Sequence, residues 1–151
     1  MNRQPVLLVD DDDNDVLFLQ NAWKKAAIPN ALTVVTDGQC AIDYLDGLRK
    51  LRPQAAQTAQ MPSLVLLDLN LPLVTGFGVL QWIRGHSEFR SLVIVILTAS
   101  SSESDVRRAY LLGANSYIVK PSNPEQLREL AGLLASYWLG WNLAPAKSAE
   151  A

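Results

Sequence analysis

The chain has 151 residues, of which 49% are hydrophobic, with a formal net charge of −2 and one cysteine. This length and apolar content suit one globular domain with a core of its own, and they argue against disorder. The sequence has no Lys/Arg run that would bind nucleic acid or an anionic membrane, and no apolar run long enough for a signal peptide or a bilayer span. The single cysteine, Cys40, fits a reducing compartment. We therefore expect a cytoplasmic protein.

Short apolar runs that end in polar residues alternate with longer amphipathic patterns. The runs predict strands over residues 6–9, 31–35, 63–67, 92–97 and 116–119, and the patterns that follow them predict helices over residues 14–27, 39–50, 77–85, 102–112 and 124–138. Gly113 is placed to stop the fourth helix, and Asn123 followed by Pro124 is a favourable start for the fifth. The polar segment 51–62 is predicted to be a loop.

The alternation of strand and helix predicts an α/β fold. Near-continuous apolar strands are typical of a parallel sheet that helices bury on both faces. Right-handed crossovers leave few topologies, so we expect a three-layer, doubly wound (βα)5 fold of the flavodoxin-like type with strand order 2-1-3-4-5. We expect one domain over residues 1–142 and a flexible tail over residues 143–151.

Four of the five predicted strands end in residues that carry chemistry. The first ends at Asp10 and Asp11, the third at Asp68, the fourth at Thr98 and the fifth at Lys120. Ligands of open α/β sheets bind beyond the carboxyl ends of the strands, where the strand order reverses, and here that point lies between the first and third strands. We therefore expect these side chains to share one site.

The residue types at this edge favour phosphoryl chemistry with a hard cation. Clustered carboxylates repel one another unless a cation is present, and oxygen-only ligands favour Mg²⁺. A carboxylate can accept a phosphoryl group as an aspartyl-phosphate, while a lysine and a threonine hydroxyl can contact the phosphoryl oxygens. Asp68 is the natural nucleophile because it lies centrally, between the acidic pair and Thr98.

Five segments, in this order, resemble the response-regulator receiver family. They are residues 8–11 (LVDD), residues 66–72 (LLDLNLP), Gly76, residues 97–99 (LTA) and residues 117–121 (YIVKP). The resemblance extends from Pro5 to about Leu139. It implies a two-component signalling protein, not an enzyme with its own substrate, whose phosphoryl group comes from a histidine kinase.

The resemblance implies a metal-binding role for the residues around the phosphorylated Asp68. Asp11 looks like a direct Mg²⁺ ligand, Asp10 would lie next to the metal through water, and Asn70 would supply its backbone carbonyl. The four consecutive aspartates at positions 10–13 leave this register open by one residue. The strand end at Val9 favours Asp10 and Asp11, with the following two aspartates in the loop and at the helix start.

The resemblance also implies a switch. Thr98 would move toward the arriving phosphoryl group, and Lys120 would pair with its oxygens. Tyr117 resembles the aromatic side chain that follows the threonine, Ala99 would keep the site open, and the bond before Pro121 is expected to be cis.

Within the family, the sequence looks similar to the single-domain partners of phytochrome histidine kinases. The features are residues 68–72, the insert over 51–62 and the ending at residues 137–139. A phytochrome kinase is then the expected phosphoryl donor, and a histidine phosphotransfer protein is a candidate acceptor. No DNA-binding output domain is expected, so signalling would go through protein–protein contacts.

The carboxyl-terminal pattern has two interpretations. An apolar stripe is predicted to pack on the sheet through Leu127, Leu130, Leu133 and Leu134. The aromatic ending, with Tyr137, Trp138, Leu139 and Trp141, either folds back on its own domain or forms a partner surface. Our hypothesis is a symmetric homodimer through the last helix.

Three other functions fit the sequence less well. A phosphatase of the haloacid-dehalogenase type needs a second carboxylate two residues after the nucleophile, where this chain has Asn70. A flavin-binding domain of the same topology predicts a Ser/Thr/Gly-rich loop after the first strand, where four aspartates would repel the flavin phosphate. A receiver that has lost phosphorylation is disfavoured by the set Asp11, Asp68, Thr98 and Lys120.

Overall fold

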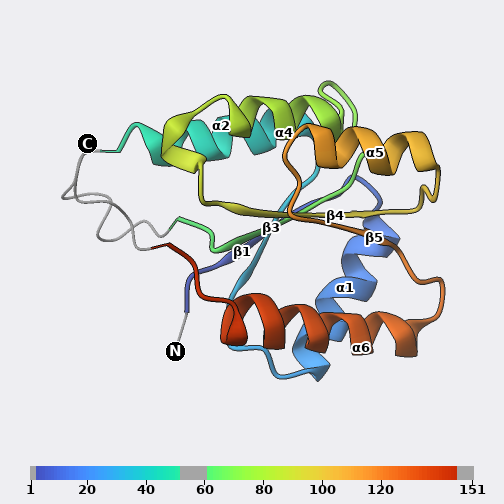
Figure 1. The fold of residues 1–151 in the computed structure, drawn as a ribbon. Coiled ribbons are helices and arrows are strands. Elements are labelled where there is room, and N and C mark those ends of the chain that lie inside the picture. The colour runs from blue at the N-terminus through green and yellow to red at the C-terminus, as the bar shows by residue number, and fades with distance from the viewer. Residues whose placement is uncertain (1–2, 52–60, 146–151) are drawn as a thin grey trace.

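The computed structural model describes residues 3–51 and 61–145, which form a five-stranded parallel sheet with helices on both faces (Figure 1). The strands are β1 (Val6–Val9), β2 (Leu32–Val35), β3 (Leu64–Leu67), β4 (Val93–Thr98) and β5 (Ser116–Val119). Their order is β2-β1-β3-β4-β5, which confirms the predicted flavodoxin-like topology. The change of direction in strand order falls between β1 and β3, as expected.

The helices divide into two layers. Helices α1 (Asp13–Lys25) and α6 (Pro124–Leu134) cover one face of the sheet, while α2 (Gly38–Arg49), α4 (Gly76–Arg84) and α5 (Glu103–Leu111) cover the other (Figure 1). A short 3-10 turn, η1 (Ser87–Phe89), precedes β4. These bounds agree with the predicted helices to within about two residues, except at the end of the last one.

Each face of the sheet has its own hydrophobic core, because successive side chains of a strand point to opposite sides. On β1, Leu7 and Val9 pack in the core under α2 and α4, while Val6 and Leu8 pack in the core under α1 and α6. All residues of β1, β3 and β4 are buried. This burial fixes the register of the strands and therefore the positions of the residues that follow them.

Polar side chains fix where the helices begin. Asp12 accepts hydrogen bonds from the N–H groups of Asn14 and Asp15, at 2.9 and 3.0 Å, and so caps α1. Asn123 caps α6, with Pro124 at its first position, as the sequence predicted. With Asp12 as the cap, only Asp10 and Asp11 lie between the end of β1 and the cap of α1.

The last helix differs from its prediction. The α-helix ends at Leu134 and continues as a wider π-helical turn, η2 (Ala135–Trp141), which the Asn142 N–H closes by donating to the Tyr137 carbonyl at 2.6 Å. Leu127, Leu130 and Leu134 pack against the core as predicted, but the expectation for Leu133 is wrong, since its side chain is 61% exposed. Leu133 directly precedes the buried Leu134 and so lies about 100° around the helix from it.

Two predicted segments lie largely outside the described residues. They are the loop over 51–62, of which 52–60 are not described, and the tail over 143–151, of which 146–151 are not described. Within the part of the chain that the structure covers, no helix combines the length and apolar character that crossing a bilayer requires.

Candidate functional site

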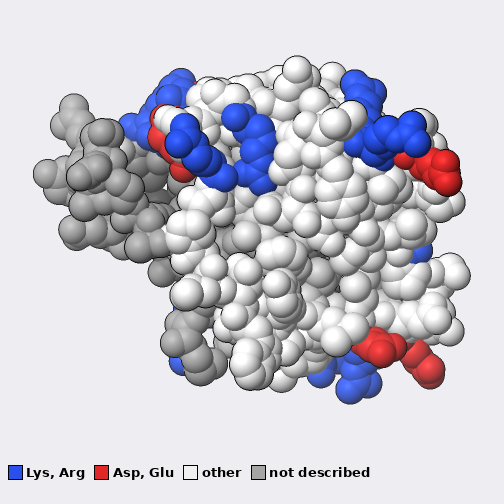
Figure 2. Space-filling model, viewed as in Figure 1, with Lys and Arg blue, Asp and Glu red and all other residues white. Residues whose placement is uncertain are grey.

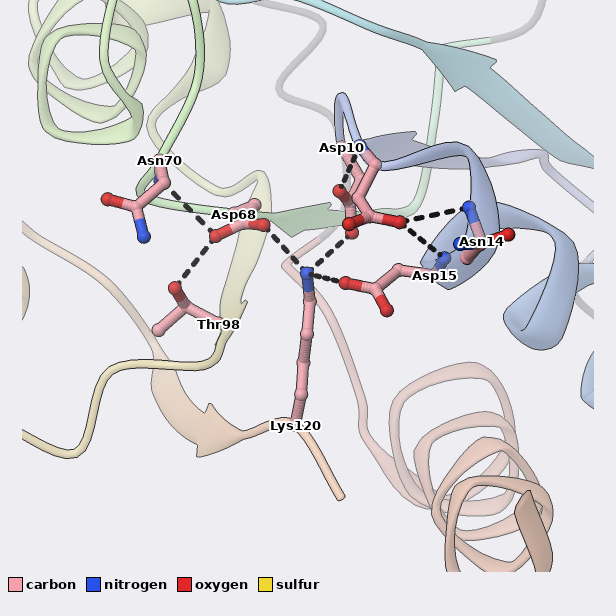
Figure 3. Close-up of polar contacts among 8 residues, drawn as sticks. Asp10, Asn14, Asp15, Asp68, Asn70, Thr98 and Lys120 are labelled. Atoms are coloured by element: carbon pink, nitrogen blue, oxygen red, sulfur yellow. Dashed lines mark hydrogen bonds and ion pairs between the residues drawn. The ribbon is translucent and has the colours of Figure 1, made fainter. Parts of the chain in front are cut away.

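The carboxyl ends of four strands bring the predicted site residues together. Val9 of β1 is paired with Leu67 of β3, so Asp10 and Asp68, the next residue on each strand, are neighbours. Thr98 ends β4 beside Val119 of β5, and Lys120 follows directly. The site is thus built by strand register, and its side chains converge from separate strands (Figure 3).

Lys120 is the centre of the charge network. Its Nζ donates to Asp10 Oδ2 and Asp68 Oδ2, each at 2.7 Å, and to Asp15 Oδ2 at 2.8 Å (Figure 3). Burial alone lowers the pKa of Lys120, but the hydrogen bonds to the three carboxylates outweigh burial and raise that pKa. The ammonium therefore stays charged throughout the neutral range and offsets part of the negative charge.

Both carboxylate oxygens of Asp68 are held in place. Oδ1 accepts hydrogen bonds from the Thr98 hydroxyl at 2.7 Å and from the Asn70 N–H at 3.3 Å, while Oδ2 accepts from Lys120. Asp68 and Thr98 are buried, with 6% and 0% of their surface exposed. A carboxylate fixed between a hydroxyl and an ammonium is already oriented for attack on a group that arrives at the strand end.

Three carboxylates could hold a cation. Asp10, Asp11 and Asp68 each offer an oxygen, and these oxygens lie within 4.8 Å of one another. Burial raises the pKa of Asp10, although hydrogen bonds from Lys120 and from the Asp12 N–H oppose that rise. An oxygen-only set with excess negative charge fits a hard divalent cation such as Mg²⁺ better than a soft metal.

The predicted switch residues lie beside this set. The Tyr117 hydroxyl donates to the Ser100 carbonyl at 2.9 Å, and the Ser100 hydroxyl donates to Asp105 at 2.6 Å, so the segment after Thr98 is tied to both β5 and α5. The expected cis bond before Pro121 is wrong, because the described residues contain no cis peptide bond. An X–Pro bond favours the trans form by about 0.5–1 kcal/mol, and with the trans form Lys120 reaches its carboxylates.

Asp15 is a site residue that the sequence analysis missed. Asp15 lies in the first turn of α1. Asp12, the last residue before that helix, is the residue that caps the helix. Side chains in a helix point back toward its amino terminus, and here that direction leads to the end of β1. Once Asp12 is recognised as the cap, this helical phase could have indicated Asp15 from the sequence.

Comparison with known proteins agrees with the geometry. The sequence model of one protein family, the response regulator receiver domain, matches residues 6–131 of this chain. Rcp1, a response regulator of Synechocystis sp., is 32% identical over 141 residues, which is 93% of this chain and 92% of Rcp1. The probable methanogenesis regulatory protein FilR2 of Methanothrix harundinacea is 36% identical over 140 residues, or 93% of this chain and 86% of FilR2.

Solved structures give the same result at the level of the backbone. The phosphorylated cyanobacterial phytochrome response regulator RcpA matches with a TM-score of 0.83 at 32% identity, covering 96% of this chain and all of RcpA. The Mn²⁺-bound form of Rcp1 matches with a TM-score of 0.79 at 31% identity, covering 95% of this chain and 99% of Rcp1. In sequence and in structure, the chain belongs to the response regulator receiver family and is close to its phytochrome-associated members.

Proposed function

We propose that this protein is a phospho-acceptor signalling switch in which Asp68 takes a phosphoryl group from the phosphohistidine of a kinase. The observation that carries the proposal is the buried Asp68 carboxylate, with Thr98 on one oxygen and Lys120 on the other. In the transfer, a carboxylate oxygen forms the new O–P bond as the P–N bond to the histidine breaks, and the imidazole nitrogen leaves with the electron pair.

Mg²⁺ is the proposed cofactor, held by Asp10, Asp11 and Asp68 with the backbone carbonyl of Asn70. When bound, the cation would neutralise charge on the phosphoryl oxygens. Lys120, whose ammonium contacts Asp68, supplies a second positive charge. The manganese-bound structure of a related receiver supports a divalent cation here.

Phosphorylation would shift the segment that follows β4. Once Asp68 is phosphorylated, the Thr98 hydroxyl can exchange its Asp68 acceptor for a phosphoryl oxygen. Because Tyr117 is hydrogen-bonded to Ser100, two residues after Thr98, a movement of Thr98 alters the packing of Tyr117. The output would be a change in protein–protein affinity of a few kcal/mol, without a DNA-binding domain.

Acetyl phosphate tests the nucleophile directly. With Mg²⁺ present, intact-mass spectrometry should detect one added phosphoryl group on the wild-type protein and none on Asp68→Asn. Asp43→Asn, which changes an exposed carboxylate on α2, is the matched control and should be labelled like wild type. Persistent labelling of Asp68→Asn would mean that the nucleophile is another residue.

A phytochrome histidine kinase is the proposed donor, and a histidine phosphotransfer protein is the candidate for onward relay. The support is the similarity to the cyanobacterial phytochrome response regulator RcpA and to two bacteriophytochrome response regulators. Radiolabelled kinases from the source organism should transfer phosphate to this protein within seconds for the cognate kinase and much more slowly for the others. Faster transfer from a kinase that is not a phytochrome would reject the proposed donor.

A homodimer through the carboxyl-terminal helix is proposed as the partner surface. Leu133, Tyr137 and Trp141 are 61, 53 and 84% exposed. Figure 2 shows that the visible side of the molecule, where α5, β5 and α6 lie, has few charges over its middle. In analytical sedimentation, Trp141→Glu should weaken the self-association of the protein. If wild-type protein at tens of micromolar sediments as a strict monomer, both phosphorylated and unphosphorylated, the dimer is refuted.

A further inference from the structure

Lys120 has one carboxylate partner more than the proposed phosphoryl chemistry uses. An ammonium has three N–H donors, and here they go to Asp10, Asp68 and Asp15. Asp68 is the proposed nucleophile and Asp10 is a proposed metal ligand. Asp15 has neither role, although its contact with Lys120, at 2.8 Å, is nearly as short as the other two.

Asp15 differs from its two neighbours in location and in what holds it. It is outside the group of three carboxylates that could share a cation, and its side chain is 41% exposed, against 4% for Asp10 and 8% for Asp68. Its backbone N–H is bound to the Asp12 cap, so α1 fixes its position. Figure 3 shows that it approaches Lys120 from α1, on the side away from Thr98.

A cation and the ammonium share two carboxylates as partners. Lys120 contacts Asp10 and Asp68, two of the three carboxylates that could hold the cation. When a divalent cation draws these carboxylates toward itself, Lys120 loses part of its hydrogen bonding. Asp15 is the one partner of the ammonium that neither cation binding nor phosphorylation consumes.

We propose that Asp15 is a positioning residue that retains the Lys120 ammonium on the α1 side of the site and so strengthens binding of a divalent cation. This inference rests on the proposed function. Loss of the Asp15 carboxylate acts twice in the same direction. It returns the ammonium fully to Asp10 and Asp68, in competition with the cation, and it removes one negative charge near the cation.

The charge effect alone sets the scale. A unit charge roughly 8 Å from a divalent ion in a water-like dielectric changes the affinity by about fivefold. Asp15→Asn is therefore expected to weaken Mn²⁺ binding by at least about fivefold. Asp13→Asn is the matched control, because Asp13 lies in the same turn of α1, is exposed, and has no contact with Lys120 in the described structure.

Electron paramagnetic resonance of free Mn²⁺ measures the dissociation constant without any phosphoryl transfer. Asp13→Asn should differ from wild type by less than about twofold, since exposed charges are screened by salt. In a Lys120→Met background, Asp15→Asn should weaken binding less than it does when Lys120 is present, because only the direct charge effect of Asp15 on the cation remains. Asp15→Glu, which keeps the carboxylate, should bind within about twofold of wild type.

The outcomes separate the inference from the function on which it rests. Equal affinities for Asp15→Asn and Asp13→Asn, a full effect of Asp15→Asn without Lys120, or an Asp15→Glu protein as weak as Asp15→Asn would each overturn the role of Asp15. Wild-type protein that binds no Mn²⁺ and takes no label from acetyl phosphate would overturn the proposed function as well. Thermal unfolding of each variant identifies a loss of binding that comes from misfolding.

Discussion

Gly76 lies against the backbone of Asp68, the proposed nucleophile, and Gly76→Ala tests the importance of that close approach. Gly76 begins α4, and its N–H donates to the Leu69 carbonyl at 2.9 Å. An added Cβ would overlap the carbonyl oxygen of Asp68 and lie 2.6 Å from the Cα of Leu69. All these atoms are backbone, so no side-chain rotation can relieve the overlap.

The expected cost follows from that rigidity. Overpacking of a buried site typically costs about 1–3 kcal/mol, and a clash with backbone belongs at the upper end of that range. At this chain length about 1 kcal/mol shifts the melting temperature by roughly 2–4 °C, so a cost of about 3 kcal/mol lowers it by roughly 10 °C. The displaced Asp68 backbone should also slow labelling by acetyl phosphate, because the carboxylate moves relative to Thr98 and Lys120.

Gly47→Ala provides the control. Apart from the backbone of its own helix and its two chain neighbours, nothing lies within 4 Å of a Cβ built on Gly47 in α2, so this variant should gain about 1 kcal/mol from helix propensity. Calorimetry and intact-mass labelling would be run on both variants. If Gly76→Ala melts at the wild-type temperature and is labelled at the wild-type rate, the close approach of α4 to the Asp68 backbone does not support the site.

Two further predictions concern charge and hydrogen bonding. Burial raises the pKa of Asp10, so the folded protein binds a proton there at a higher pH than the unfolded chain does, and stability falls as the pH rises between those two pKa values. In urea unfolding with EDTA at pH 7, Asp10→Asn should therefore have a higher free energy of unfolding than wild type. The difference between the two free energies should shrink as the pH is lowered toward 4. A lower free energy of unfolding for Asp10→Asn at pH 7 would contradict this prediction. Arg84 donates hydrogen bonds to the carbonyls of Gly113 and Phe89 and to Asn115 Oδ1, at 2.9, 3.1 and 2.9 Å. In the same assay, Arg84→Met should therefore lower the free energy of unfolding by about 2–3 kcal/mol. Arg107→Met, at an exposed position, is the control and should leave that free energy nearly unchanged.

Much of the fold could be predicted from the sequence, because its strands are short apolar runs with abrupt polar ends. Residues 116–119 were predicted with the bounds that β5 has, and Asn123 and Pro124 begin α6 as expected. These features depend on local sequence alone. The end of the last helix was harder to predict, since the aromatic residues after Leu134 fit either a regular helix or a wider turn.

The site could be predicted as far as strand ends determine it. Asp10 and Asp68 meet because parallel strands in register place their next residues side by side, and the long side chain of Lys120 reaches both from the end of β5. Asp15 could not be found by that rule, since a helix brings it there, and its position depends on which aspartate caps α1. The conformation at Pro121 was also beyond local sequence, because both isomers of an X–Pro bond are close in energy.

Residues 61–63 enter the sheet at the end of β3 opposite the proposed phosphoryl site. Met61 and Pro62 lead into the amino end of β3, while Asp68 follows its carboxyl end, with the whole buried strand between them. Insertions next to Met61 are therefore expected to leave the proposed phosphoryl site unchanged. An affinity tag or fluorescent reporter spliced in at this end should report on the protein without disturbing the chemistry at the other.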